Sequence, residues 1–310
     1  MAKQGSGVLG ATIVLVILFF TYTAVSSEAL TSFGLTSLVN AGAALAIAAV
    51  GETIVVLVGG FDLSVGAVLS LVNVLVATQL RAGAWSGIAI TALALALGAA
   101  AGCTNGLLVG FLGLSSIIAT LATSFVFSGA ALLLLPEPGG TVPTAFSLMF
   151  TGDFANVPNA LVVLLVVVLV WFLIKRTRLG TAMYAIGSDS ESSRASGLNV
   201  RFSLFWLYAL SGLFYGIAGV FLSALTASGD PNLGAPMTLS VFAAVVVGGT
   251  VLGGGRGGAV GSIIGAFIIA LIADILFAVN ISSFYTYIFT GLLLVVAVSL
   301  NSLRSGASSP

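Results

Sequence analysis

Apolar residues run almost without interruption along this chain, and short polar or glycine-rich stretches divide them into lengths that fit a membrane. A helix needs roughly 20 apolar residues to cross the hydrocarbon core of a bilayer. The pattern predicts spans near 8–25, 35–58, 63–80, 87–110, 115–135, 158–174, 203–224, 238–253, 258–278 and 284–302. We therefore expect an all-α, polytopic transmembrane bundle of about ten spans, forming one domain over residues 1–310. The number of full crossings falls if 59–67 or 248–258 is re-entrant.

Composition supports the membrane class and removes several others. Of the 310 residues, 59% are hydrophobic and only 6% are charged, and the mean hydropathy is +1.24. A soluble domain carries charge at about a quarter of its residues. The formal net charge is zero, which gives no basis for nucleic-acid binding. The chain has no histidine, the commonest general base and a usual zinc ligand, so we expect no catalytic residue, no metal and no cofactor.

The basic residues predict which side of the membrane each loop faces, because lysine and arginine concentrate in cytoplasmic loops. With ten spans and a cytoplasmic N-terminus, Arg81 alone lies outside. The others lie inside: Lys3, Lys175, Arg176, Arg178, Arg194, Arg201, Arg256 and Arg304. The C-terminus is then cytoplasmic too, and residues 175–202 form the largest cytoplasmic loop. The run from Val8 to Phe20 also has the form of a signal peptide, but a retained span is favoured because further spans follow directly.

Within that loop, "YAIGSDSESSRASGLNVRF" at 184–202 predicts a short helix near 189–196. Ser188 and Glu191 have the spacing of a capping box, in which Ser188 accepts from the backbone N–H of Glu191. Gly197 supplies the left-handed position that often ends a helix. A helix of two turns is marginal alone, so we expect it to pack on another protein, with Arg194 facing that partner. A solvated loop is the alternative.

Polar side chains inside the apolar runs are the candidates for a translocation pathway. An acidic side chain at mid-span costs roughly 2.5–3.5 kcal/mol on insertion scales, so such residues face the bundle or water. Six side chains are singled out on this ground: Glu52, Asp62, Asn73, Asn105, Thr120 and Ser124. For Glu52, a role in transport and an internal pairing that holds the bundle together are equally open. Asp62 fits better as the N-cap of the helix that follows.

Glycine spacing predicts how the helices pack. Gly98, Gly102, Gly106 and Gly110 recur at every fourth position, which lets two helix backbones approach closely. The sequence contains no G-x-x-x-x-G-K-[ST] motif, so if ATP drives transport another chain must bind it.

Four stretches resemble the membrane permease subunits of ribose/xylose/galactose-type ABC sugar importers, and they occur in the order typical of that family. They are "GGFDLSVGAVLSL" (59–71), "NGLLVGFLGLSSIIATLATSFVFSGAALLL" (105–134), "GTAMYAIGSDSESSRASGLNV" (180–200) and "AVVVGGTVLGGGRGGAVGSIIGA" (244–266). The third stretch resembles the cytoplasmic loop that carries the coupling helix. The sequence departs from the family at "SDSESS", which is more polar than usual, and at "LSS" (114–116), which lacks the common proline.

The resemblance implies a type II ABC importer-like fold in the bacterial inner membrane, contacting lipid. It implies a second permease chain, identical or similar, ABC ATPase subunits on the cytoplasmic side and a sugar-binding protein outside. The chain is then no enzyme, and a monosaccharide, a pentose or hexose, moves inward by alternating access. The residues expected to couple to the ATPase are Gly187, Ser188, Asp189, Glu191, Arg194 and Gly197. The alternatives are a proton-coupled secondary transporter that uses Glu52 or Asp62 and, least favoured, a purely structural membrane subunit.

Overall fold

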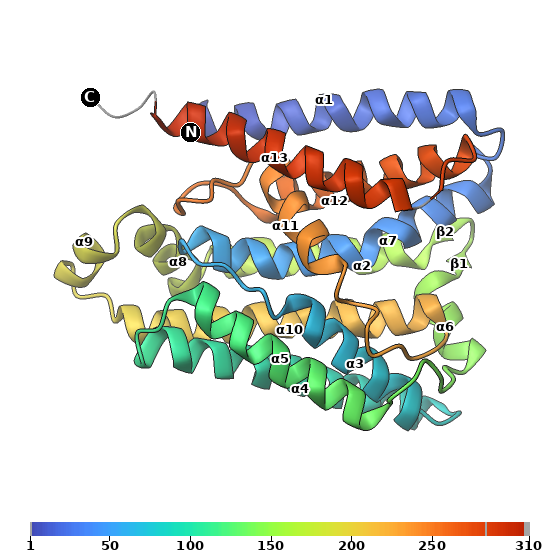
Figure 1. Cartoon of the computed structure of the whole chain (residues 1–310), viewed down its shortest axis with the longest axis horizontal. Coiled ribbons are helices and arrows are strands. Elements are labelled where there is room, and N and C mark those ends of the chain that lie inside the picture. Colours follow the sequence, from blue (N-terminus) through green and yellow to red (C-terminus); the bar gives the residue numbers. More distant parts are fainter. Residues whose placement is uncertain (1, 283, 307–310) are drawn as a thin grey trace.

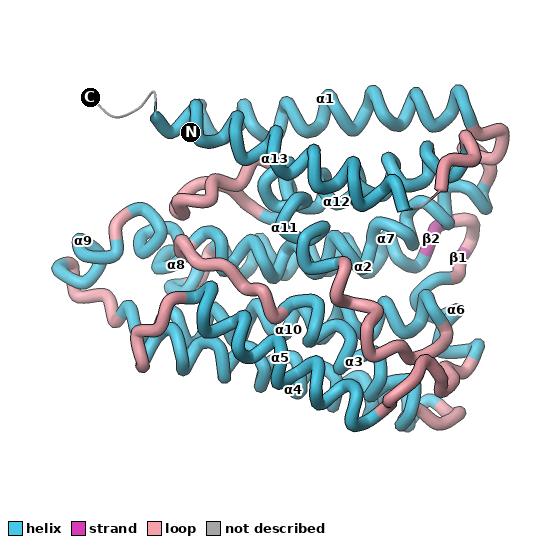
Figure 2. Tube along the Cα trace, viewed as in Figure 1, coloured by secondary structure: helices cyan, strands magenta, loops and turns pink. Residues whose placement is uncertain are grey.

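The structure is a computed structural model that describes residues 2–282 and 284–306, and most of this part of the chain is helical (Figure 1, Figure 2). The long elements are α1 (Ala2–Val25), α2 (Ser32–Leu57), α3 (Val65–Gln79), α4 (Ala84–Gly106) with the π-helical turn η1 (Leu107–Phe111), α5 (Ser116–Leu134), α7 (Asn159–Lys175), α10 (Val200–Thr226), α11 (Met237–Val247), α12 (Ala259–Ala278) and α13 (Phe284–Gly306). The short elements are α6 (Thr144–Thr151), β1 (Asp153–Phe154), β2 (Val157–Pro158), α8 (Arg178–Ser188) and α9 (Ser190–Ala195).

Six of the described helices are long and apolar enough to cross a membrane, namely α1, α2, α4 with η1, α5, α10 and α12. The pair α7 and α8, which is bent by 75°, adds a seventh if it counts as one span. Helices α3 and α11 and the apolar part of α13 are shorter. The predicted all-α polytopic class is therefore confirmed, whereas the count of about ten spans stays a prediction.

Helices α2 and α10 form the centre of the bundle, and α1 lies at its edge. About two thirds of the apolar window in each of α2 and α10 is buried (67%), against 11% in α1, which packs along α12. The largest fully buried side chains include Tyr208, Phe214, Tyr215 and Phe221, all on α10. Figure 1 shows α2 and α10 running side by side along the long axis with the other helices around them.

The predicted glycine stripe on α4 is the surface on which α10 packs. A Cβ atom on Gly98 would collide with the backbone of Gly212, and one on Gly102 would collide with the carbonyl oxygen of Tyr208. Gly106 and Gly110 face the backbone of Phe205 and Arg201 in the same way. The prediction of close internal packing is confirmed, because any side chain at these positions would separate the two helices.

The chain is broken twice inside the bundle. After α2, residues 58–64 turn back along α2 before α3 continues, and after α10 residues 227–236 return into the bundle before α11 begins (Figure 1, Figure 2). The predicted span 238–253 is too long, because α11 ends at Val247 and the chain to residue 258 is irregular. Gly249, with φ of 88°, takes a left-handed conformation that lets Thr250 N donate to Val245 O (3.1 Å) and closes the helix.

Three elements were not predicted: α6, α8 and the hairpin formed by β1 and β2. The hairpin pairs Asp153 with Pro158 and Phe154 with Val157, around a turn in which Ala155 and Asn156 both have positive φ. Only two residue pairs form this hairpin, which is too short to produce a periodic hydrophobic pattern.

Candidate functional site

The structure brings four of the six pathway candidates into one buried cluster beside the first break. Glu52 comes from α2, Asp62 from the 58–64 segment, Asn105 from α4 and Thr120 from α5, and each is at most 1% exposed. Residues 52 and 62 meet because the 58–64 segment runs back along the last turns of α2. The sequence does not show where this segment reverses direction, so the contact between Glu52 and Asp62 was not predicted.

Glu52 joins the broken segment to α10. Its Oε1 accepts a hydrogen bond from the backbone N–H of Asp62 (3.1 Å), and its Oε2 accepts one from the Tyr215 hydroxyl (2.7 Å). Of the two roles left open for Glu52, these contacts support internal pairing, because both carboxylate oxygens hold parts of the bundle together.

Asp62 organises the turn into α3. Its Oδ1 accepts from the backbone N–H (2.9 Å) and the hydroxyl (2.6 Å) of Ser64, and Asn105 Nδ2 donates to both carboxylate oxygens at 3.3 Å. The prediction that Asp62 is the N-cap of α3 is wrong by two positions, since Ser64 is the N-cap residue and makes no side-chain cap. The carboxylate instead accepts from the backbone ahead of the helix, as in an Asx turn.

The cluster satisfies backbone groups that a continuous helix would satisfy by itself. Phe61 N donates to Ser116 Oγ (3.1 Å), Asp62 N to Glu52, and Leu63 N to Thr120 Oγ1 (3.0 Å). Gly59 N and Gly60 N donate to the carbonyls of Val56 and Val55. Non-helical backbone at membrane depth is tolerated only when such partners exist. The buried polar residues therefore build the break, and Thr120 has this structural role as well.

The other two pathway candidates lie outside the cluster. Asn73 Nδ2 donates to Ser228 O (3.0 Å), and its Oδ1 accepts from Asp230 N (2.7 Å), so it anchors the loop that follows α10. Ser124 Oγ donates to Leu121 O (2.6 Å), a local bond within α5.

Sequence reasoning missed two tyrosines of α10 that face the break. Tyr215 bonds to Glu52, and the Tyr208 hydroxyl lies 2.6 Å from where a Cβ on Gly60 would be. Tyr208 is fully buried, and its hydroxyl has no hydrogen-bond partner among the described residues. The available signal was their spacing, because positions seven apart on a helix share a face.

The loop at 175–202 contains α8 and α9, which lie at one end of the bundle (Figure 1). Helix α9 agrees with the predicted range near 189–196, but its cap is different. Asp189 is the N-cap, and its Oδ1 accepts from the backbone N–H of Glu191 (2.9 Å) and Ser192 (3.1 Å). The predicted capping box is wrong, because Ser188 still belongs to α8 and its hydroxyl donates to Tyr184 O (2.9 Å).

The charge of Asp189 is stabilised by the same contacts. The Ser192 hydroxyl donates to Asp189 Oδ2 (2.7 Å), and this bond, with the backbone N–H groups of the first turn, lowers the pKa of Asp189 below its ordinary value. The carboxylate also lies at the positive end of the helix dipole. An ionised Asp189 therefore favours a folded α9.

The predicted end of α9 is confirmed. Gly197 has φ of 85°, its N–H donates to Arg194 O (3.0 Å), and Leu198 N donates to Ser193 O (3.1 Å). This is the hydrogen-bond pattern of a Schellman motif. Ser193 is buried, whereas the side chains of Glu191, Ser192 and Arg194 are exposed. Two caps thus hold a short helix that presents a polar face.

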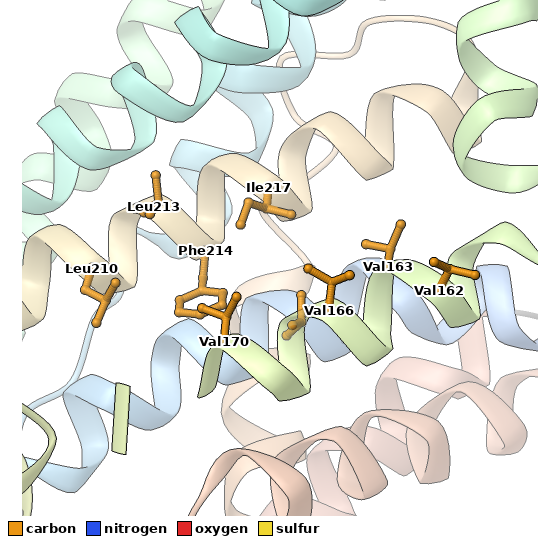
Figure 3. Close-up of a pocket in the computed structure, with 9 residues that line it drawn as sticks. Val162, Val163, Val166, Val170, Leu210, Leu213, Phe214 and Ile217 are labelled. Carbon is orange, nitrogen blue, oxygen red and sulfur yellow. The ribbon is translucent and has the colours of Figure 1, made fainter. Parts of the chain in front are cut away.

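A cavity of about 240 Å³ lies between α7 and α10 (Figure 3). Its lining is entirely aliphatic or aromatic: Val162, Val163, Val166, Val167, Val170, Leu210, Leu213, Phe214 and Ile217. A sugar needs hydrogen-bonding groups, and this lining offers none. The cavity is therefore no candidate for sugar recognition.

These features define a polytopic membrane protein whose buried polar residues support broken helices. The family model described as "Branched-chain amino acid transport system / permease component" matches residues 34–298. The chain belongs to this family of permease components, and its resemblance to the permeases of sugar importers is confirmed.

Several curated relatives cover most of the chain. The ribose import permease protein RbsC of Bacillus subtilis (strain 168) is 35% identical over 83% of this chain and 81% of its own length. The D-allose transport system permease protein AlsC of Escherichia coli (strain K12) is 32% identical over 96% and 92%. The galactose/methyl galactoside import permease protein MglC of the same strain is 31% identical over 83% of both chains. No solved structure matches this chain.

Proposed function

We propose that this chain is the membrane-spanning subunit of an ATP-driven importer and moves a monosaccharide of the pentose or hexose class into the cytoplasm. The relatives named for ribose, allose and galactose import support a sugar as the cargo. ATP is hydrolysed by separate ATPase subunits, and a sugar-binding protein delivers the sugar from outside. A second permease chain, identical or similar, completes the pathway.

The single observation that carries the ATP-driven mechanism is α9, a two-turn helix capped at both ends. Isolated helices of this length are marginal in water, so a helix held by both an aspartate cap and a Schellman motif is suited to a fixed contact. Its exposed face carries Glu191, Ser192 and Arg194. Arg194 forms no ion pair or hydrogen bond with other described residues through its side chain, which leaves its guanidinium available to a partner.

Two features support a cytoplasmic position for α9. In Figure 1 the start of α1 and the end of α13 lie at the same end of the bundle as α8 and α9. The basic residues of the α7–α8 junction and of the loop before α12 belong to this end as well, which is what the positive-inside rule expects of a cytoplasmic face. Counting the pair α7 and α8 as one span and adding α3, α11 and α13 to the longer spans is consistent with ten crossings, in which α3 and α11 each cross together with the irregular stretch before them.

The test is a pair of arginine variants in the complex of this chain with its genuine ATPase and binding protein. Arg194→Ala removes the exposed cation from α9, and Arg178→Ala removes an exposed cation from the start of α8 and serves as the control. We expect the Arg194 variant to insert normally but to lose ATPase co-purification and sugar-stimulated ATP hydrolysis, whereas Arg178→Ala retains both. Full coupling by Arg194→Ala would contradict the docking role of α9.

The proton-coupled alternative receives no support of its own from the site. The carboxylates of Glu52 and Asp62 are engaged with backbone and side-chain donors that hold the 58–64 segment. Uptake by the purified chain alone in liposomes, driven by a proton gradient, would favour this alternative over the ATP-driven importer.

A further inference from the structure

Three segments distant in the sequence meet through their backbones at the C-terminal end of α8. The carbonyl of Leu57, at the end of α2, accepts a hydrogen bond from Gly255 N (2.9 Å) in the loop between α11 and α12. Gly187, in the last turn of α8, lies against both. A Cβ on Gly187 would overlap the Leu57 carbonyl oxygen and would reach 2.5 Å from Gly255 N.

Two further glycines complete this contact, which we call the glycine junction and define as Leu57, Gly59, Gly187, Gly254 and Gly255. Gly254 has φ of 83°, and a Cβ there would lie 2.8 Å from Gly187 O and 3.0 Å from Gly59 N. A Cβ on Gly255 would lie 2.6 Å from Ser188 Oγ. Gly187, Gly254 and Gly255 therefore have no room for a side chain at this contact.

A tyrosine ties α8 to the same loop one turn earlier. The Tyr184 hydroxyl donates to Gly257 O (3.1 Å). This bond gives the contact between α8 and residues 254–257 a second point of attachment. A phenylalanine at position 184 would remove it by deleting a single oxygen atom.

The junction connects α9 with two irregular segments of the chain, residues 58–64 and 248–258. Asp189, the N-cap of α9, comes two residues after Gly187. Leu57 and Gly59 open the 58–64 break that Glu52 holds, and Gly254 and Gly255 belong to the irregular segment between α11 and α12. Backbones in direct contact have no side-chain rotamers to absorb a displacement, and close-packed contacts change between discrete arrangements rather than deforming smoothly.

We propose that the glycine junction transmits a displacement of α9 to both segments at once, so that Gly187 and Gly254 are positioning residues for coupling rather than for docking. This inference rests on the proposed function, in which an ATPase moves α9. It predicts that ATPase docking and ATPase coupling are affected independently. A side chain added in the junction leaves α9 and its exposed face intact. It changes the packing of α8 against the end of α2 and against the loop between α11 and α12.

The experiment compares Gly187→Ala and Gly254→Ala with Gly253→Ala in the complex with the genuine ATPase and binding protein, reconstituted in liposomes. Gly253 is the matched control, because it adjoins Gly254, a Cβ there meets nothing within 4 Å, and its φ is not left-handed. We expect both junction variants to retain ATPase co-purification while sugar uptake per ATP hydrolysed falls roughly fivefold or more, the lower end of measured allosteric couplings. Gly253→Ala is expected to match the wild type.

Tyr184→Phe keeps the experiment decisive if a junction variant does not fold, since it deletes only the hydroxyl that bonds Gly257 O. We expect it to bind the ATPase normally and to couple less well. The inference is overturned if Tyr184→Phe and every junction variant that folds couple as well as the wild type. It is also overturned if the variants lose ATPase binding to the same extent as they lose coupling. Failure of the unmodified chain to bind an ATPase would instead overturn the proposed function.

Discussion

The carboxylate of Glu52 accepts a hydrogen bond from the backbone N–H of Asp62 (3.1 Å) and thereby fixes the 58–64 segment against α2. The two residues are ten apart in the chain, yet they are side by side because the segment reverses direction after Gly59, whose φ is 80°. A buried acid in a membrane protein invites a role in transport. Here the acid serves the backbone, and it allows a helix to be interrupted inside the bundle.

Replacing Glu52 tests this structural role. Glu52→Ala leaves Asp62 N and the Tyr215 hydroxyl without their acceptor, so we expect a loss of roughly 2–4 kcal/mol in stability, from two unsatisfied buried groups. Glu52→Gln keeps the size and one carbonyl acceptor and is expected to lose less. The measurement is thermal unfolding in detergent, with Glu28→Ala at an exposed position as the control. Equal stability of Glu52→Ala and Glu28→Ala would contradict the interpretation.

Most of the transmembrane architecture follows from the sequence, because span length is set by the bilayer and each apolar run is long. The predicted runs 115–135 and 258–278 differ by one residue at each end or less from α5 and α12. The exception is 238–253, where the apolar pattern continues through Val251 and Leu252 although glycines end α11 at Val247. A hydropathy pattern does not detect the end of α11, because the backbone conformation of glycine, and not a change in polarity, ends the helix.

The candidate site was predictable in its residue types but not in its arrangement. Intramembrane polarity identified Glu52, Asp62, Asn105 and Thr120, which do meet, and also Ser124, which does not. What joins the four is the reversal at 58–64, a feature of tertiary structure. The cap of α9 shows a similar limit, because Ser188 and Asp189 are both good N-caps and the choice depends on where α8 ends.

The packing of α4 on α10 gives a second prediction. Gly102→Ala places a Cβ against the Tyr208 carbonyl, and because the obstacle is backbone, we expect destabilisation of about 1–3 kcal/mol. Gly129→Ala in α5 is the control, since a Cβ there meets nothing within 4 Å, and its stability should match the wild type within about 1 kcal/mol. The shift of the thermal unfolding midpoint of each variant in one detergent decides the matter. If the Gly102 variant is as stable as the Gly129 variant, α4 and α10 are able to move apart without a loss in the free energy of unfolding.

Asn73 and Ser124 provide a third prediction, because the sequence treats them alike and the structure does not. Asn73→Ala removes the bonds to Ser228 O and Asp230 N that anchor the loop after α10, so we expect faster proteolysis of residues 227–236 and a loss of about 1–3 kcal/mol. Ser124→Ala removes one local bond within α5 and is expected to change neither quantity. Limited proteolysis of both variants, quantified by mass spectrometry, distinguishes them. Equal cleavage rates in the two variants would mean that Asn73 does not hold the loop.

The cap of α9 gives a pH-dependent prediction with a definite sign. The pKa of Asp189 is lowered in the folded chain, chiefly by the Ser192 hydroxyl, so the charged cap stabilises α9 at any pH above the ordinary value of 3.8. This stabilisation is lost as the pH falls through the lowered pKa of the folded state. We expect the protection of α9 amides against hydrogen exchange, corrected for intrinsic rates, to decline below about pH 4 in the wild type.

Asp189→Asn is the matched variant for this measurement, because asparagine caps helices about as well as aspartate but does not titrate. Its α9 protection should stay constant over the same pH range, whereas Asp189→Ala should show low protection throughout. A decline in Asp189→Asn equal to that of the wild type would place the titrating group elsewhere, and Glu191, the other acid of the helix, would be the next to replace. If α9 docks on an ATPase as proposed, the alanine variant should also bind it more weakly at neutral pH, since the partner must then order the helix itself.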